Sequence, residues 1–121
     1  MDIDRAEALL TVVVRGSGRS VIVRPEGELD NDTVQPLSEA LEDALQGPPG
    51  PVVVDCGGLS FCDSTGLNLL LRMSREAESD GRPLLLAGLS PIVTRLFEIT
   101  GAKSVLRIYP TVDDALAGQE G

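Results

Sequence analysis

The sequence predicts an α/β fold in which a mixed β-sheet is opened by an antiparallel hairpin and helices pack on it, in the order ββαβαβαβα. Two β-branched runs flank a short Gly-containing loop near the start. Further apolar runs of strand length then alternate with segments whose apolar residues recur every three or four positions. With 42% hydrophobic residues in 121, we expect one domain over residues 1–121, with its core at about 9–117.

The hairpin is expected from residues 9–14 and 21–24. Both runs are rich in Val, Leu and Ile, and GSGR at residues 16–19 separates them. A short loop with Gly between two such runs is typical of a β-hairpin. Two antiparallel strands should therefore open the fold.

The first helix is expected between the N-cap candidates Asp30, Asp32 and Thr33 and the sequence GPPG at residues 47–50. Gly and Pro at that point should end the helix. Its apolar face is formed by Val34, Leu37, Leu41 and Leu45.

A central strand and a second helix should follow. Residues 52–56 are apolar without alternation, as expected of a strand that is covered on both faces. A loop with Gly57 and Gly58 then leads to a helix that begins at Ser64 or Thr65, with Asp63 as its cap. The apolar face of this helix is formed by Leu67, Leu70, Leu71 and Ala77.

The next strand and helix are set apart by Gly and Pro. Residues 84–87 are apolar, and Ser90 with Pro91 is a typical N-cap and first-turn pair. Gly101 should end this third helix. Its apolar residues are Ile92, Val93, Leu96, Phe97 and Ile99.

The chain should finish with a strand at residues 105–108 and a short helix. Thr111 is the expected cap of that helix, which should run through Ala117. Residues 118–121, GQEG, are expected to lie beyond it as a frayed tail.

Composition excludes several classes of partner. Ten basic residues against 19 acidic ones give a net charge of −9, which disfavours nucleic acid and anionic membranes. Three aromatic residues are too few for a platform that stacks on single-stranded nucleic acid. No apolar run approaches 18 residues, and the first ten residues, MDIDRAEALL, are acidic where a signal peptide is basic. We expect a soluble cytoplasmic protein.

The two cysteines, Cys56 and Cys62, are expected to be reduced thiols. Without any histidine or a second cysteine pair, they lack the ligands of a tetrahedral zinc site. Cys56 should pack inertly in a buried strand. Cys62 is expected to be more exposed, which leaves its oxidation open as an alternative.

Ser64 stands where a negative charge would be tolerated. The first backbone N–H groups of a helix lack intrahelical acceptors, and the aligned peptide dipoles place partial positive charge there. A phosphate on Ser64 would therefore find hydrogen-bond donors. The simpler alternative is that Asp63, Ser64 and Thr65 only cap the helix.

Enzymatic alternatives fit these residues poorly. A nucleophilic Ser64 would need a base, but there is no histidine, and Lys103, the single lysine, is distant in sequence. Asp30, Asp55 and Asp63 could hold Mg²⁺ or accept a phosphoryl group as receiver domains do, but such a domain would not begin with a hairpin. Asp55 is more simply expected to cap the turn at residues 57–60 through its carboxylate.

No cofactor is expected. Neither GxGxxG nor GxxxxGK[ST] occurs in the chain, so the common nucleotide cradles are missing. The pair of Gly57 and Gly58 is expected to form a turn. We therefore expect no catalysis, no cofactor and no metal.

Four segments together resemble the STAS family, most closely the bacterial anti-sigma-factor antagonists. They are PEGELD at residues 25–30, VVVDCGGLSFCDSTGL at 52–67, LLLAGLSPIVTRLFEITG at 84–101 and YPTVDDAL at 109–116. The resemblance covers residues 9–117 and implies a STAS-like fold. It also implies that Ser64, the first hydroxyl after Asp63, is the phosphorylation site.

The resemblance implies a partner-switching protein rather than an enzyme. The unphosphorylated form would bind an anti-sigma factor with a histidine-kinase-like ATPase fold and release its sigma factor. That anti-sigma factor would act as a serine kinase on Ser64 and end the interaction, and a metal-dependent serine phosphatase would reset it. The alternative is a STAS ligand-binding or scaffolding domain that is never phosphorylated; Asp63 and Ser64 at the helix start weigh against it.

The resemblance also implies a partner-binding surface on two segments. Its residues are Glu28, Leu29, Asp30 and Asn31 in one segment and Asp63, Ser64, Thr65, Gly66 and Leu67 in the other. Asp30 has the alternative role of capping the first helix. Two departures from the family pattern are Cys62, where an aliphatic residue is common, and Asn68, where glycine is frequent; Asn68 is the one expected to alter partner choice.

Overall fold

The structure is a computed structural model, and it describes residues 10–119. The expected start of the first strand at residue 9, the acidic N-terminal segment and the last two residues of the tail lie outside the described residues. Within the described range, no helix is long and apolar enough to cross a membrane.

The sheet is mixed, as the sequence predicts. The strands β1 (Leu10–Ser17) and β2 (Ser20–Leu29) form an antiparallel hairpin around a turn in which Gly18 has a φ of 61°, a conformation that glycine adopts without steric cost. The strands β3 (Val52–Asp55), β5 (Leu84–Ala87) and β6 (Arg107–Tyr109) continue it in parallel, in the order β1-β2-β3-β5-β6.

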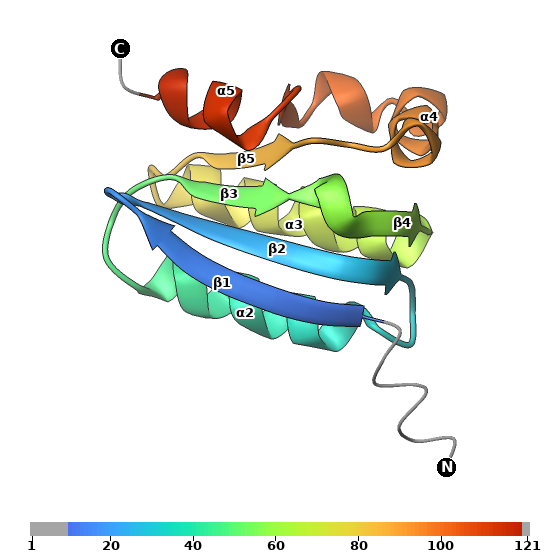
Figure 1. The fold of residues 1–121 in the computed structure, drawn as a ribbon, viewed down its shortest axis with the longest axis horizontal. Helices are drawn as coiled ribbons and strands as arrows, with labels where there is room; N and C mark the ends of the chain where they lie inside the picture. The colour runs from blue at the N-terminus through green and yellow to red at the C-terminus, as the bar shows by residue number, and fades with distance from the viewer. Residues whose placement is uncertain (1–9, 120–121) are drawn as a thin grey trace.

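The helices cover the sheet unequally (Figure 1). The helices α2 (Val34–Gln46) and α3 (Ser64–Ser79) pack on one face and enclose the main core, which α4 (Pro91–Thr100) joins through Val93 and Phe97. The short helix α5 (Val112–Ala117) covers β3 and β5 on the opposite face, where Ala115 meets Val53 and Leu85. Among the described residues, no helix in Figure 1 lies over β1 on that second face.

The structure contains one strand that the sequence analysis missed. After β3, Cys56–Gly58 form a 3-10 turn, and Leu59–Cys62 then form β4, which pairs in parallel with the second half of β2. The observed order is therefore ββαββαβαβα rather than ββαβαβαβα. The missed strand has only four residues and follows two glycines, so its sequence has the appearance of a loop. It is the element that carries the chain to Ser64.

Two smaller expectations were wrong. Cys56 begins the 3-10 turn instead of ending β3, and the last strand is Arg107–Tyr109 rather than residues 105–108, because Ala102–Ser104 form another 3-10 turn. The five apolar residues expected in the third helix all lie in α4, but Ile92 and Ile99 point outward and are 66% and 71% exposed. Helical spacing alone did not distinguish these outward residues from Val93 and Phe97.

Arg82 ties the end of α2 to the sheet, and the sequence analysis did not identify it. Its side chain is buried and donates hydrogen bonds to the carbonyl oxygens of Ala44, Leu45, Pro48 and Gly50. The last carbonyl groups of a helix lack intrahelical donors, so a guanidinium is well suited to satisfy them. Arg82 thus holds the GPPG segment against the start of β5.

Candidate functional site

Ser64 is exposed at the first position of α3, directly beyond β4. Asp63 is the N-cap, as predicted, and its Oδ1 atom accepts a hydrogen bond of 3.1 Å from the N–H of Gly66. The N–H of Asp63 donates to the carbonyl oxygen of Leu29 at 3.1 Å, which joins the helix start to the end of β2. The hydroxyl of Ser64 is therefore presented by a helix start that is fixed on both sides.

Gly66 allows the first turn of α3 to pack tightly on the sheet. A Cβ atom at this position would lie 2.6 Å from Cγ of Leu29 and 3.0 Å from Sγ of Cys62. Real side chains do not approach so closely, so any other residue would displace the helix start or Leu29. The glycine next to Ser64 is thus a packing requirement.

The segment after β2 is held by hydrogen bonds of its own. Oδ1 of Asp30 accepts from the N–H groups of Asp32 and Thr33 at 2.9 and 3.2 Å. The hydroxyl of Thr33 donates to the carbonyl oxygen of Glu28 at 2.7 Å and accepts from the N–H of Asp30 at 2.9 Å. Asp30 therefore orders the turn before α2. The N-cap is Thr33, and the N–H groups that Asp30 accepts from precede the helix, so the capping role left open for Asp30 was wrong.

The structure brings the two expected partner-binding segments together, because Leu29 pairs with Cys62 in the β2–β4 ladder. The exposed members are Glu28, Asn31 and Ser64, and Asp30, Asp63 and Thr65 are half-buried. Leu29, Gly66 and Leu67 are buried, so the side chains of the two leucines lie beneath this surface in the free protein. Their place in the partner-binding surface stays a prediction.

A groove of about 420 Å³ between α2 and α3 begins beside Ser64, and the sequence analysis did not predict it. Thr65 is on its wall, and Arg72 and Arg75 supply positive charge in a chain of net charge −9. Polar residues at helical spacing on the facing sides of two neighbouring helices were the available signal. The groove is lined by Val34, Gln35, Ser38, Thr65, Asn68, Leu69, Leu71, Arg72 and Arg75.

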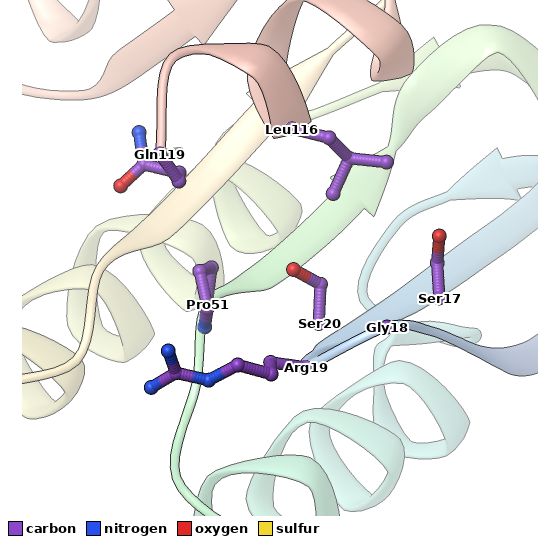
Figure 2. Close-up of a pocket in the computed structure, with 7 residues that line it drawn as sticks. All are labelled: Ser17, Gly18, Arg19, Ser20, Pro51, Leu116 and Gln119. Atoms are coloured by element: carbon purple, nitrogen blue, oxygen red, sulfur yellow. The ribbon is translucent and has the colours of Figure 1, made fainter. Parts of the chain in front are cut away.

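A second cavity lies beside the β1–β2 turn, whereas Ser64 follows β4 at the other end of β2. Figure 2 shows the residues that line this cavity. Its volume is about 480 Å³, and it opens between the β1–β2 turn, Pro51 just before β3, and the C-terminal segment at Leu116 and Gln119. Among the described residues that line it, Arg19 alone is charged. The cavity brings none of the predicted site residues together.

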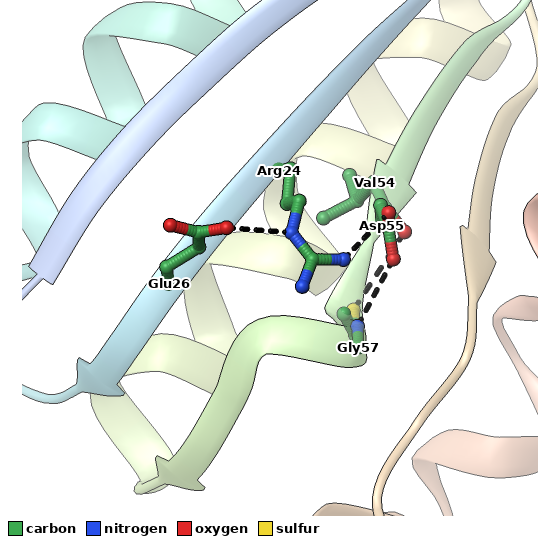
Figure 3. Close-up of polar contacts among 6 residues, drawn as sticks. Arg24, Glu26, Val54, Asp55 and Gly57 are labelled. Carbon is green, nitrogen blue, oxygen red and sulfur yellow. Dashed lines mark hydrogen bonds and ion pairs between the residues drawn. The ribbon is translucent and has the colours of Figure 1, made fainter.

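Asp55 is engaged in an ion pair (Figure 3). Oδ1 accepts from the N–H of Gly57 at 3.0 Å, as predicted for the turn, and Oδ2 lies 2.9 Å from Nη1 of Arg24. Arg24 also donates from Nε to Glu26 at 2.8 Å, and hydrogen bonds to Glu26 and then Asp55 raise the pKa of Arg24. The carboxylate is thus occupied structurally, unlike the free phosphoacceptor of the receiver alternative.

Within residues 10–119, no group of three or more His, Cys, Asp or Glu side chains is arranged to hold a metal ion. Asp30 and Asp63 each accept backbone N–H groups through Oδ1, and Asp55 accepts one N–H and binds Arg24. The three carboxylates considered as a magnesium site therefore have separate local roles.

Both cysteines are buried, so the expectation that Cys62 would be exposed was wrong. Cys56 is fully buried, as predicted, and Cys62 is 5% exposed. Burial, with smaller contributions from the Cys62 thiol and Asp55, raises the pKa of Cys56 to about 12. Burial, with a smaller contribution from Asp63, raises the pKa of Cys62 to about 12. Since the thiolate is the reactive form, neither thiol should react in the folded protein at neutral pH.

We expect an aromatic disulfide reagent at pH 8 to label neither thiol within minutes, and to label both after denaturation. Because the folded-state pKa values lie above the ordinary value of 9.0, the thiols favour folding below pH 9, and this contribution is lost between pH 9 and 12. The free energy of unfolding should fall there by about 1.4 kcal/mol per thiol per pH unit. A Cys56→Ala, Cys62→Ala double variant should lose this fall in the free energy of unfolding above pH 9. Rapid labelling of the native protein would show that the thiols are not buried and unreactive.

The fold and the site together define a small α/β domain that presents an exposed serine at a fixed helix start. The family model described as "Mlab, STAS domain" matches residues 12–108. The chain belongs to the STAS-domain family, and the resemblance seen in its motifs is confirmed.

The relatives are regulatory proteins. A Mycobacterium tuberculosis protein with the provisional name anti-anti-sigma factor is 34% identical over 109 residues, which cover 88% of this chain and 74% of that protein. The anti-sigma-B factor antagonist of Staphylococcus aureus is 35% identical over 86 residues, covering 71% of this chain and 80% of its own.

Solved structures agree with the fold over nearly the whole chain. An anti-sigma factor antagonist from Mycobacterium paratuberculosis gives a TM-score of 0.80 at 26% identity, covering 93% of this chain and 95% of its own. SpoIIAA, an anti-sigma factor antagonist, gives 0.72 at 28% identity in its unphosphorylated form, with coverage of 88% and 93%. The phosphorylated form of SpoIIAA from Bacillus gives 0.67 at 26% identity, with coverage of 88% and 97%.

Proposed function

We propose that this protein is an anti-sigma-factor antagonist that is switched by phosphorylation of Ser64. The unphosphorylated form binds a kinase-type anti-sigma factor with a histidine-kinase-like ATPase fold and releases its sigma factor. Phosphorylation by the same anti-sigma factor ends the interaction, and a metal-dependent serine phosphatase restores it. The protein is then a kinase substrate and binding partner in the cytoplasm, with no catalysis of its own.

The observation that carries the proposal is the exposure of Ser64 at the first residue of a capped helix. A kinase must reach the hydroxyl, and this position is reached without unfolding. The carboxylate of Asp63 accepts the N–H of Gly66, while the N–H groups at the first two helical positions lack intrahelical acceptors. These groups and the helix dipole favour a phosphate by about 0.3 to 1 kcal/mol in the free protein.

The same phosphate would oppose binding to the partner. It would add nearly two negative charges beside Asp63, in a chain of net charge −9. An unpaired charge buried at an interface costs roughly 2 to 5 kcal/mol, which weakens binding about 30-fold to several thousand-fold. The helix dipole offsets too little of this cost to preserve the complex.

The groove between α2 and α3 favours a second candidate, a STAS domain that binds a ligand or acts as a scaffold without phosphorylation. Its volume of about 420 Å³ is within the range of small-molecule sites. Incubation with ATP, Mg²⁺ and purified kinase-type anti-sigma factors separates the two. Under the second candidate no phosphate is gained.

We expect phosphate transfer in that experiment to occur on Ser64 and not on Thr65. Ser64 is exposed, whereas Thr65 is half-buried on the wall of the groove. Mass spectrometry of proteolytic fragments locates the phosphate. Ser64→Ala should abolish incorporation and Thr65→Ala, the matched control, should retain it. Modification of Thr65 with Ser64 unmodified would overturn the assignment.

A further inference from the structure

The two edges of the sheet differ in a way that bears on self-association. The edge strand β6 has three residues, begins with Arg107 and is followed by Pro110, so it offers little to a further strand. The opposite edge, β1, has eight residues and carries neither proline nor charge before Arg15. Within residues 10–119, no strand pairs with the outer side of β1. The β6 edge is therefore protected against pairing with another strand, and the β1 edge is not.

The register of the hairpin shows which peptide groups of β1 face outward. The N–H of Val21 donates to the carbonyl oxygen of Pro51, so the peptide groups of odd-numbered residues in this part of β2 point toward β3. The peptide groups of the even-numbered residues therefore point toward β1. There they form hydrogen-bonded pairs: residue 20 with 17, 22 with 15, 24 with 13 and 26 with 11. The peptide groups of Leu10, Val12, Val14 and Gly16 are left pointing away from the sheet.

The side chains along this edge are also apolar and exposed. Val13 is 49% exposed and Val14 is 53% exposed, one on each face of the strand. A long, apolar edge with free peptide groups is a template for another strand.

We propose that β1 pairs antiparallel with β1 of a second copy of this chain, about a two-fold axis at Val13. In this register Val12 lies opposite Val14 of the partner copy, and Leu10 lies opposite Gly16. The outward peptide groups of these four residues therefore meet those of the other copy. The two Val13 side chains bury each other on one face, and Val12 covers Val14 on the other. The pairing is self-complementary, as a two-fold interface must be.

The position of Arg15 favours a two-fold axis at Val13 over one at Val14. Arg15 lies opposite Thr11 of the other copy, and Thr11 is itself paired with Glu26 in β2, so the guanidinium extends toward a carboxylate. A two-fold at Val14 would instead place the two Arg15 side chains diagonally across the axis. Like charges so close in a sheet are destabilising.

The helices permit this arrangement. A two-fold through β1 places α2 of both copies on the same face of the continued sheet. Gln35 and Ser38 of α2 face the groove with α3, so the opposite side of α2 faces the β1 edge. That side carries Pro36, Ala40 and Ala44, whose small side chains allow two helices to approach closely.

Sedimentation of the full chain over a concentration series tests the proposal. A short edge interface and a net charge of −9 per chain favour a weak dimer, half-formed at roughly 100 μM. Val13→Lys places like charges on the two-fold, and Val14→Pro removes an outward N–H without removing a bond to β2. Each should weaken the dimer at least tenfold. Ile99→Lys, at an exposed apolar position on α4, is the control and should associate like the wild type.

Cross-linking tests the register itself. The two Val13 residues would form a non-hydrogen-bonded pair with Cα atoms about 4.5 Å apart, which suits a disulfide. Val13→Cys should therefore cross-link on mild oxidation, whereas Arg15→Cys, four residues from its symmetry mate, should not. The native cysteines are buried and should not interfere. Three results would overturn the proposal: a chain that stays monomeric up to about 1 mM, a dimer that Val13→Lys does not weaken, or equal cross-linking of Val13→Cys and Arg15→Cys.

Discussion

Ser64→Asp is expected to bind the kinase-type anti-sigma factor about 30-fold more weakly than the wild type, whereas Ser64→Ala is expected to bind as tightly as the wild type and to resist inactivation by ATP. The aspartate places a permanent charge beside Asp63, in the surface predicted from Glu28, Asn31 and Ser64. Its charge is smaller than that of a phosphate, so its effect should lie at the low end of the range for phosphorylation. Alanine removes only the accepting hydroxyl.

Isothermal titration of both variants with the anti-sigma factor in its nucleotide-bound form measures this difference. Ser79→Asp is a suitable control, because Ser79 is also exposed but lies at the other end of α3. All three variants should melt within a few degrees of the wild type, since the changes are at exposed positions. Equal affinities of Ser64→Asp and Ser64→Ala would remove the electrostatic explanation of the switch.

Arg82→Ala should be the most destabilising of the single changes considered, lowering the free energy of unfolding by about 3 kcal/mol. It leaves the carbonyl groups of Ala44, Leu45, Pro48 and Gly50 without their charged donor in a partly buried setting. The end of α2 and the segment before β3 would both lose their attachment. The melting temperature should fall by roughly 10 °C in a domain of this size.

Urea unfolding followed by circular dichroism measures that loss. Arg95→Ala, on the exposed side of α4, is the matched control and should change stability by less than about 0.5 kcal/mol. Arg82→Lys should lie between the two, because an ammonium cannot reach all four carbonyl oxygens at once. An Arg82→Ala variant as stable as the control would show that these hydrogen bonds do not hold the segment.

Most of the fold followed from local patterns. The hairpin, the buried β3, the caps Asp63, Ser90 and Thr111, and the order of the later elements were predicted because turn chemistry and apolar period agree in those segments. The strand β4 was not predicted because its pairing with β2 depends on residues more than thirty positions away. Local propensity carries no information on such a partner.

In the candidate site, too, local sequence predicted some features and packing between separate elements decided the others. Ser64 and Asp63 were identified from a motif, and the structure places them at a helix start as predicted. Which neighbours are buried could not be predicted, since the burial of Leu29 and Cys62 follows from the contact of Gly66 with both. The groove beside Thr65 and the anchoring by Arg82 likewise arise from the packing of separate elements.

Titration of the anti-sigma factor with authentic Ser64-phosphorylated protein, beside unphosphorylated protein from the same preparation, tests the central claim most directly. The phosphate acts by local charge and shape at a fixed helix start, so the two forms should give the same far-UV circular dichroism spectrum. Their affinities should nevertheless differ about 30-fold to several thousand-fold. Equal affinities would contradict the switch, and a loss of helix on phosphorylation would show that the modification acts by remodelling the domain.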